Sequence, residues 1–220
     1  MHKFRIQFSK TGRAAYLSHL DTMRTLQRAI ARAKLPVKHT EGFNPHAYIS
    51  IALPLSLGYT SDCEYLDLIL LELLPENEIL DRLNAVFPEG FRVLRAYEQE
   101  MKVKEIAGAK FVLDFEYDKG FDESVVAGLE KLLTRSSILV MKKSKRGETE
   151  TDIAPMIYSL AFVPEEGKLR VLAHLAAGSA MSLNPEYLLR VIHNEAPNLA
   201  PDFVRFHRVA VTCSDGSDFH

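Results

Sequence analysis

Hydrophobic and polar residues alternate along several short stretches of the chain, and this alternation predicts β-strands. Residues 3–8 are the clearest case, because they place Phe4, Ile6 and Phe8 on one face. The first half contains three further strand-like stretches, at residues 47–53, 63–73 and 91–100.

Two stretches of the first half follow a helical period instead. The first begins at Ser18, where Ser18 and Asp21 can cap each other, and it ends before Pro36. Its apolar stripe is expected to comprise Leu20, Met23, Leu26, Ala29, Ile30 and Ala33. The second helix is expected from Pro75 to about Phe87, with acidic residues in its first turn.

The second half repeats these patterns less regularly. Strands are predicted at residues 110–117, 138–146, 153–163, 168–176 and 203–211, and helices at 122–135 and 184–196. The order β-α-β-β-α-β in the first half is that of a ferredoxin-like unit. The sequence therefore predicts an α+β protein of two tandem ferredoxin-like units, 1–102 and 103–220, the second less regular, with the junction within 101–109.

Charge is distributed unevenly along the chain. The net charge is −2, yet residues 1–50 hold nine Lys and Arg against two acidic residues, and residues 51–100 hold three against ten. A nearly neutral protein can therefore present a local positive field. The alternative is that the two segments neutralise each other across a shared sheet.

The basic residues of the first helix form a regular series. Arg24, Arg28 and Arg32 recur every four residues and so share one helix face. Arginine matches phosphate geometry with two-point contacts, and no acidic residue stands four positions along to neutralise the series. We predict a nucleic-acid-binding surface made of these three with Lys10, Arg13 and Lys38; a solvated helix face is the alternative. A second basic turn, at Lys142, Lys143, Lys145 and Arg146, could extend it.

The stretch Gly42-Phe43-Asn44-Pro45-His46 predicts a distinctive loop, since Asn before Pro favours a turn. We expect Asn44 and His46 to contact a base or ribose. Together with His19 and Asp21 at the start of the helix they could line a polar pocket, where His19, Asp21 and His46 are candidate catalytic residues. The alternatives are that Asp21 only caps the helix, that Asn44 only holds its own turn and that His46 only packs beside a strand.

Several classes of site are not indicated by the sequence. Two distant cysteines, Cys63 and Cys213, have no metal or redox spacing, and no phosphate-binding glycine loop or nucleophile elbow is present. We therefore expect no metal and no cofactor held by this chain alone. The N-terminus does not resemble a signal peptide and no apolar run is long enough for a membrane helix, so we expect a cytoplasmic protein without membrane contact.

Taken together, these motifs resemble a known family. Ser18-His19-Leu20-Asp21, the Arg-rich helix and Gly42–His46 are followed by the Pro54–Gly58 and Glu64–Asp67 stretches, and later by Thr151–Ile157 and Ser182–Glu186. This series resembles the radical SAM-linked protein family of bacteria, with Ala47 where that family usually has Pro. The resemblance implies a partner, a B12-binding radical SAM enzyme, but no established activity and no catalytic residues.

Three hypotheses follow from the sequence. The preferred one is an RNA-binding accessory module that presents tRNA or rRNA to a radical SAM enzyme for modification or processing. The second is an enzyme that acts on nucleic acid or a phosphorylated substrate through His19, Asp21 and His46. The third is a scaffold whose basic helix docks an acidic face of the radical SAM partner.

Overall fold

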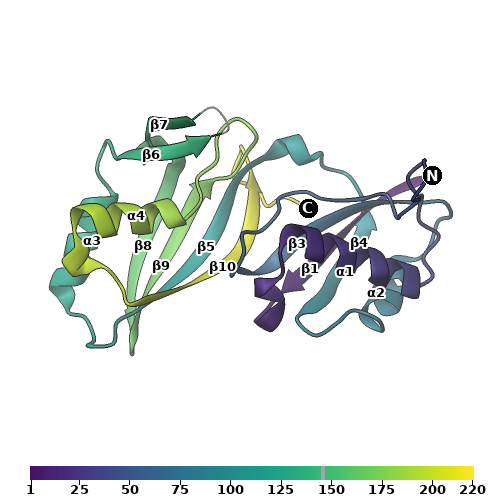
Figure 1. Ribbon diagram of the computed structural model, residues 1–220, viewed down its shortest axis with the longest axis horizontal. Helices are drawn as coiled ribbons and strands as arrows, with labels where there is room; N and C mark the ends of the chain where they lie inside the picture. Colours follow the sequence, from purple (N-terminus) through teal and green to yellow (C-terminus); the bar gives the residue numbers. More distant parts are fainter. Residues whose placement is uncertain (145–146) are drawn as a thin grey trace. The chain divides into compact units, whose positions relative to one another are not determined.

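The computed structural model describes residues 1–144 and 147–220, and it confirms the α+β class. Its described residues form four α-helices and mostly antiparallel sheet. Two compact units are present (Figure 1). The first comprises Met1–Glu105 with His207–Ala210 and Asp218–His220, and the second comprises Ile106–Phe206 with Val211–Ser217. Since the first unit takes in segments from both halves of the sequence, neither unit is one continuous stretch.

The first unit contains a four-stranded antiparallel arrangement with two helices. Its elements are β1 (His2–Lys10), α1 (His19–Arg32), β2 (Ile49–Ile51), β3 (Thr60–Leu70), α2 (Glu76–Asn84) and β4 (Phe91–Glu98). Strand β1 pairs with β3 on one side and β4 on the other, and β2 pairs with the far side of β3. A short 3-10 helix, η1 (Gly12–Tyr16), connects β1 to α1.

Period-two alternation on β1 produces the core of this unit. Phe4, Ile6 and Phe8 are buried, and they belong to one hydrophobic cluster with Leu26 and Ile30 of α1. The prediction that Leu20 belongs to the apolar stripe of α1 is wrong, since 66% of this residue is exposed. At about 100° per residue, Leu20 points well away from the direction shared by the buried α1 residues, and Thr22 occupies the stripe instead.

The second unit has the same succession of elements with an added hairpin. Its elements are β5 (Ile106–Glu116), α3 (Glu123–Leu133), β6 (Leu139–Ser144), β7 (Gly147–Asp152), β8 (Ile157–Glu165), β9 (Lys168–Ala176), α4 (Glu186–Glu195) and β10 (Phe203–Cys213). In its sheet β5 lies between β10 and β9, and β8 pairs with β9. Strand β7 was not predicted, because its polar residues form a strand only through pairing with β6.

Candidate nucleic-acid interface

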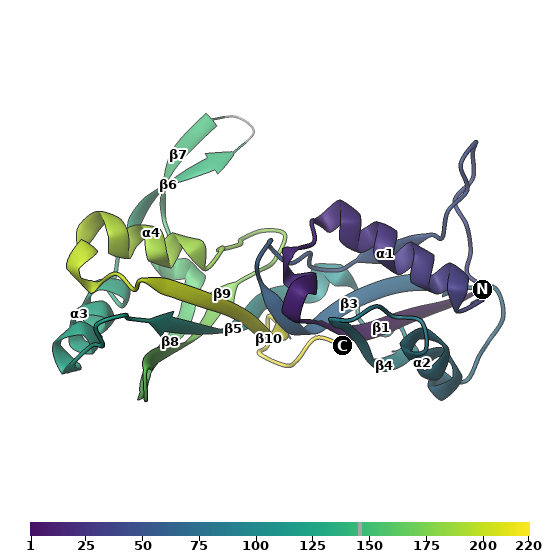
Figure 2. The same ribbon diagram turned by 60° about the horizontal axis from the view of Figure 1, so that its bottom comes forward.

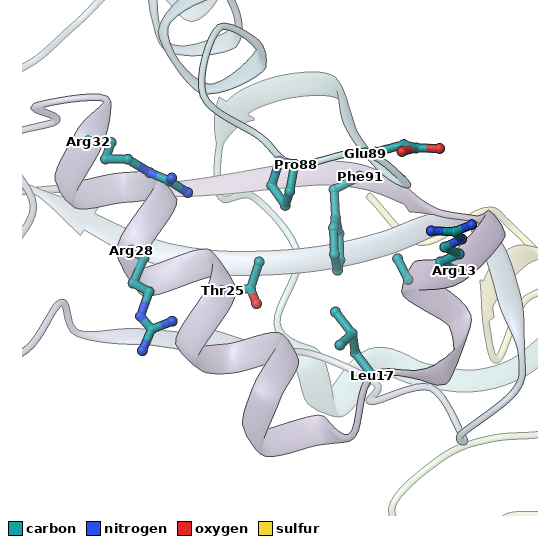
Figure 3. Close-up of a pocket in the computed structure, with 9 residues that line it drawn as sticks. Arg13, Leu17, Thr25, Arg28, Arg32, Pro88, Glu89 and Phe91 are labelled. Carbon is teal, nitrogen blue, oxygen red and sulfur yellow. The ribbon is translucent and has the colours of Figure 1, made fainter.

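A groove of about 340 Å³ lies on the helical side of the first unit. Figure 3 shows Arg28 and Arg32 extending from α1 on one side, Arg13 on the other, and Phe91 between them. The groove is lined by Arg13, Ala14, Leu17, Thr25, Arg28, Arg32, Pro88, Glu89 and Phe91. Basic groups thus flank an apolar floor.

The helical period explains why α1 contributes three of these residues. Thr25, Arg28 and Arg32 are three and four positions apart, so they share one face at the margin of the buried stripe. The floor comes from the start of β4, where Phe91 packs against Phe8 at 6.1 Å and Phe87 at 6.3 Å between ring centroids. These aromatic contacts fix the floor against which the arginines stand.

A close backbone contact at Gly90 holds η1 beside the start of β4. The Thr11 N–H donates to the Gly90 carbonyl at 2.8 Å, and Gly90 has a φ of 87°. A Cβ on Gly90 would lie 2.6 Å from the Thr11 carbonyl oxygen. Only glycine tolerates both conditions, and this contact places Arg13 across the groove from α1.

The three groove arginines are not neutralised by the protein. Among the ion pairs of residues 1–144 and 147–220, none involves Arg13, Arg28 or Arg32. Glu89 is the one acidic residue in the lining, and none of the three arginines pairs with it. Arg24 differs, because its guanidinium lies 3.5 Å from Asp21. An exposed cluster of arginines without protein partners attracts anions.

One arginine of the N-terminal segment, Arg5, is neutralised by an acidic residue of the neighbouring strand β3. Arg5 is buried and makes a two-point contact with Asp67, at 2.7 and 2.9 Å. Its remaining nitrogen donates to the His220 carbonyl at 2.9 Å, and its guanidinium lies 4.3 Å from the Phe219 ring centre. Arg5 is therefore structural, whereas the groove arginines face solvent.

Lys10 does not contribute to the exposed surface. Only 3% of this residue is accessible, and its ammonium donates to the Leu17 carbonyl at 3.1 Å. Burial lowers the pKa of Lys10, although the nearby Glu64 carboxylate partly offsets this. Desolvation of an ammonium is costly, and the hydrogen bond to Leu17 offsets part of that cost. The same hydrogen bond anchors the segment before α1. We therefore leave it out of the proposed binding surface.

The polar pocket expected from His19, Asp21, Asn44 and His46 is not formed. His19 and Asp21 lie in the first turn of α1, which follows the Lys10 end of β1. The segment carrying Asn44 and His46 starts beside the opposite end of this sheet, where Val37 pairs with Leu70, the partner of His2. A helix of 14 residues separates the two sites by roughly 20 Å. These side chains therefore cannot act on one small substrate.

Each of these polar residues has a local contact. Ser18 accepts a hydrogen bond from the Asp21 N–H at 3.2 Å and also contacts its carboxylate, as expected for a helix cap. His46 contacts Thr40 and the Asn44 carbonyl, both through Nδ1. Asn44 and His46 are exposed, so both remain available for a ligand.

The groove also contains residues that sequence reasoning missed. Leu17 and Thr25 could have been found from their helical or near-helical spacing to Arg13 and Arg28, but Pro88, Glu89 and Phe91 arrive from a distant part of the chain. In the second basic turn, Lys142 donates to the Ser182 carbonyl at 2.8 Å. The side chain of Lys143 and all of Lys145 and Arg146 lie outside the described residues.

Two classes of site can be surveyed over the described part of the chain. It holds no group of three or more His, Cys, Asp or Glu side chains close enough to share a metal ion. None of its helices has the length and apolar character needed to cross a bilayer. Burial raises the pKa of the Cys63 thiol to about 11, which disfavours the reactive thiolate.

The sequence matches, over residues 3–185, the family described as "Uncharacterized protein conserved in bacteria (DUF2344)". No curated protein matches the chain. Among solved structures, a chain of a Cbf5-Nop10-Gar1 complex is similar in fold, with a TM-score of 0.54 at 9% identity; the alignment covers 94% of this chain and 48% of that one. This chain thus spans about half the length of that neighbour. An unknown protein from Galdieria sulphuraria aligns over 94% of this chain and 96% of its own at 11% identity, but its TM-score is 0.28 and it bears on neither fold nor function.

Proposed function

The chain belongs to DUF2344, a family of uncharacterized proteins conserved in bacteria, and from that premise we propose that it is an RNA-binding accessory module. The observation that carries the proposal is the groove with Arg13, Arg28 and Arg32 around Phe91. Guanidinium groups bind phosphates in two-point contacts, and their positions on α1 and η1 are fixed by the fold. An apolar floor beside them suits a ribose or base edge.

The distribution of ionic contacts supports this side of the first unit as the binding surface. On the other face of β1, Arg5 is fully enclosed and bound to Asp67. Along α1, Arg24 has a weak exposed partner in Asp21, which a phosphate could displace at little cost. Arg24 and Lys38 therefore extend the surface, while Asn44 and His46 supply contacts to bases or riboses.

We also propose that both units are ferredoxin-like, the second carrying the β6–β7 hairpin as an insertion. The first unit has the strand order β4-β1-β3-β2, and the second has β10-β5-β9-β8. The first strand of each unit lies between its third and its fourth strand, when the β6–β7 hairpin is not counted. In the first unit β1 lies between β3 and β4, and in the second β5 lies between β9 and β10.

The partner in this proposal is a radical SAM enzyme of the B12-binding type. Its support is the sequence pattern from Ser18-His19-Leu20-Asp21 to Gly42–His46. In such a pair the present chain holds the RNA and the partner performs the modification. Co-expression with a B12-binding radical SAM enzyme of the kind the resemblance implies, followed by pull-down and RNA sequencing, would recover both together.

The direct test is a titration of fluorescently labelled tRNA at several salt concentrations. Three phosphate contacts on a single strand predict a log–log slope of about −2, at about 0.7 per phosphate. Replacing Arg28 or Arg32 by Ala should weaken binding of all RNAs and make the slope shallower by about 0.7.

A matched control is Arg135→Ala, which removes the same charge from a site in the second unit. Arg135 is bound to Glu195 at 2.7 and 3.1 Å, so it is not free to bind phosphate. Its replacement should leave the slope unchanged. Absence of salt-dependent binding by the wild type at low ionic strength would refute the RNA proposal, and the pull-down would then test protein docking.

A further inference from the structure

Phe43 is the most exposed large hydrophobic residue of the described chain. Its relative exposure is 107%, and it lies in the segment between α1 and β2. Neither the apolar floor of the groove nor the core includes it. Covering a fully exposed phenylalanine with an apolar surface lowers the free energy, because its ring is removed from water.

The segment around Phe43 is a hairpin-like loop held by its own hydrogen bonds. The Tyr48 N–H donates to the Lys38 carbonyl and the Thr40 N–H to the His46 carbonyl, both at 2.8 Å. At the tip, the His46 N–H donates to the Thr40 hydroxyl at 3.2 Å. Gly42 has a φ of 122°, which allows the chain to turn directly before Phe43. The ring is therefore presented on a preorganised loop, which lowers the entropy cost of binding.

The segment that carries the ring is basic and polar. Lys34 and His39 are exposed, Lys38 lies 6.0 Å from the Tyr48 ring centre, and Glu41 is the one acidic residue of the loop. Interleaved cations and aromatic rings are typical of surfaces that bind single-stranded nucleic acid. Tyr48, Leu71 and Leu73 are exposed as well, and the lysines of the segment favour nucleic acid as the partner, because lysine is depleted in the cores of protein–protein interfaces.

The loop and the groove are joined by α1. Arg32 is in the last turn of this helix, and the following segment extends beyond the helix end (Figure 2). Arg32 and the base of the loop thus lie toward the same end of α1, which is the end that one RNA strand would have to cross to contact both. Lys34 and Lys38 lie on the connecting segment and add two positive charges to it.

We propose that Phe43 stacks on an unpaired base of RNA whose phosphates are held by the groove arginines. This inference rests on the proposed function and specifies its substrate class as RNA with a single-stranded loop or end. Bases within a duplex are stacked on one another and cannot receive the ring, whereas unpaired bases can.

The experiment compares Phe43→Ala, Phe43→Leu and Phe43→Trp in binding a fluorescein-labelled single-stranded RNA and the same strand annealed to its complement. Phe43→Ala should weaken single-strand binding by about 5- to 150-fold, the range for the loss of one stacked base. The salt slope should not change, because stacking releases no counterions. Phe43→Leu should restore little of this affinity and Phe43→Trp most of it, since stacking requires a ring. Duplex binding should be the same in all variants.

The chain has no Trp, so Phe43→Trp also introduces a single fluorescent reporter. Its emission should be quenched at saturating single-stranded RNA and unaffected by duplex. Phe203→Ala is the matched control, because Phe203 is a half-exposed phenylalanine of the second unit. It should bind as wild type.

Two failures are distinguishable. If Arg28→Ala weakens binding but Phe43→Ala binds as wild type, or the indole emission of the Phe43→Trp variant does not respond to bound RNA, the stacking inference is wrong and the groove remains. If the wild type binds no RNA at low salt, both the stacking and the proposed function are wrong. A loss of affinity equal for single strands and duplex would also overturn the inference.

Discussion

Single residues determine whether the groove exists and what it attracts. Arg28 and Arg32 are basic side chains without an ion-pair partner in the described structure, whereas Arg5 of the same unit is bound to Asp67. The same residue type thus has opposite roles within one unit. The difference lies in burial, because a buried guanidinium must be matched by a carboxylate and an exposed one need not be.

Replacing Gly90 by Ala tests the close contact that supports the groove. The added Cβ would meet the Thr11 carbonyl oxygen at 2.6 Å, at a φ of 87° that disfavours side chains. We expect a loss of about 2–4 kcal/mol in the free energy of unfolding, and weaker RNA binding as Arg13 shifts. Urea denaturation measures the first, and Gly120→Ala, whose Cβ would meet nothing within 4 Å at a similar φ of 73°, is the control for backbone strain alone. Equal losses in the two variants would contradict the contact.

Lys10→Met tests the buried ammonium through the pH dependence of stability. Burial lowers the pKa of Lys10 in the folded state, so between that pKa and 10.5 the unfolded chain binds more protons. In the wild type, Lys10 therefore makes the free energy of unfolding rise with pH between its folded-state pKa and 10.5. Below its folded-state pKa, Lys10 is charged in the folded protein, and the full cost of burying that charge lowers the stability. The variant should lack this rise when urea denaturation is measured from pH 8 to 10.5. Cys63 and Tyr65, with raised pKa values, act in the opposite direction but are common to both proteins, so they cancel in the difference.

Elements are positioned by signals at their ends as much as by their apolar faces. Helix α1 begins where Ser18 accepts from the Asp21 N–H, and Lys34, with a φ of 53°, follows its end in the left-handed conformation. These end signals set which residues face the sheet. They consequently also set which residues line the groove at its margin.

Ser18→Ala tests this capping contact. Loss of the hydroxyl leaves an N–H of the first turn without its acceptor, and should destabilise the protein by about 1 kcal/mol. RNA binding should be nearly unchanged at low temperature, because Arg28 and Arg32 lie two or more turns further along α1 and Arg13 is held in η1 by the Gly90 contact. Thermal unfolding followed by circular dichroism gives the first value. A Ser18→Thr variant, which keeps a hydroxyl that both accepts from the Asp21 N–H and donates to its carboxylate, should retain the wild-type stability.

The whole molecule brings together segments that are far apart in sequence. Residues Asp218–His220 belong to the first unit, where Tyr65 donates to the Phe219 carbonyl at 2.7 Å and Phe219 is buried. Arg5 contacts both this segment and Asp67. Residues 218–220 therefore form part of the packing of the first unit.

Asp67→Asn tests this packing. The change leaves Arg5 buried with an uncompensated charge and should cost about 3–5 kcal/mol of stability. The C-terminal segment should exchange its amide hydrogens faster, because Arg5 also holds the His220 carbonyl. Hydrogen exchange followed by mass spectrometry measures this. If the exchange of residues 214–220 is unchanged while stability falls, Arg5 does not anchor the segment.

Local patterns in the sequence determined most elements of this protein. Period-two alternation identifies β1, β5 and β9, and the capping residues identify the start of α1, since these features act over a few neighbouring residues. The series Arg24, Arg28, Arg32 follows directly from helix geometry. The α+β class follows from the order of these elements.

Only the tertiary structure decided what those elements bring together. It buries Lys10, places His19 and His46 at opposite ends of α1, and sets Phe91 beneath arginines some 60 positions earlier in the chain. It also pairs the polar strand β7 with β6. The physical reason is that burial and long-range contact depend on how whole elements pack, and a pattern of neighbouring residues carries no measure of that packing.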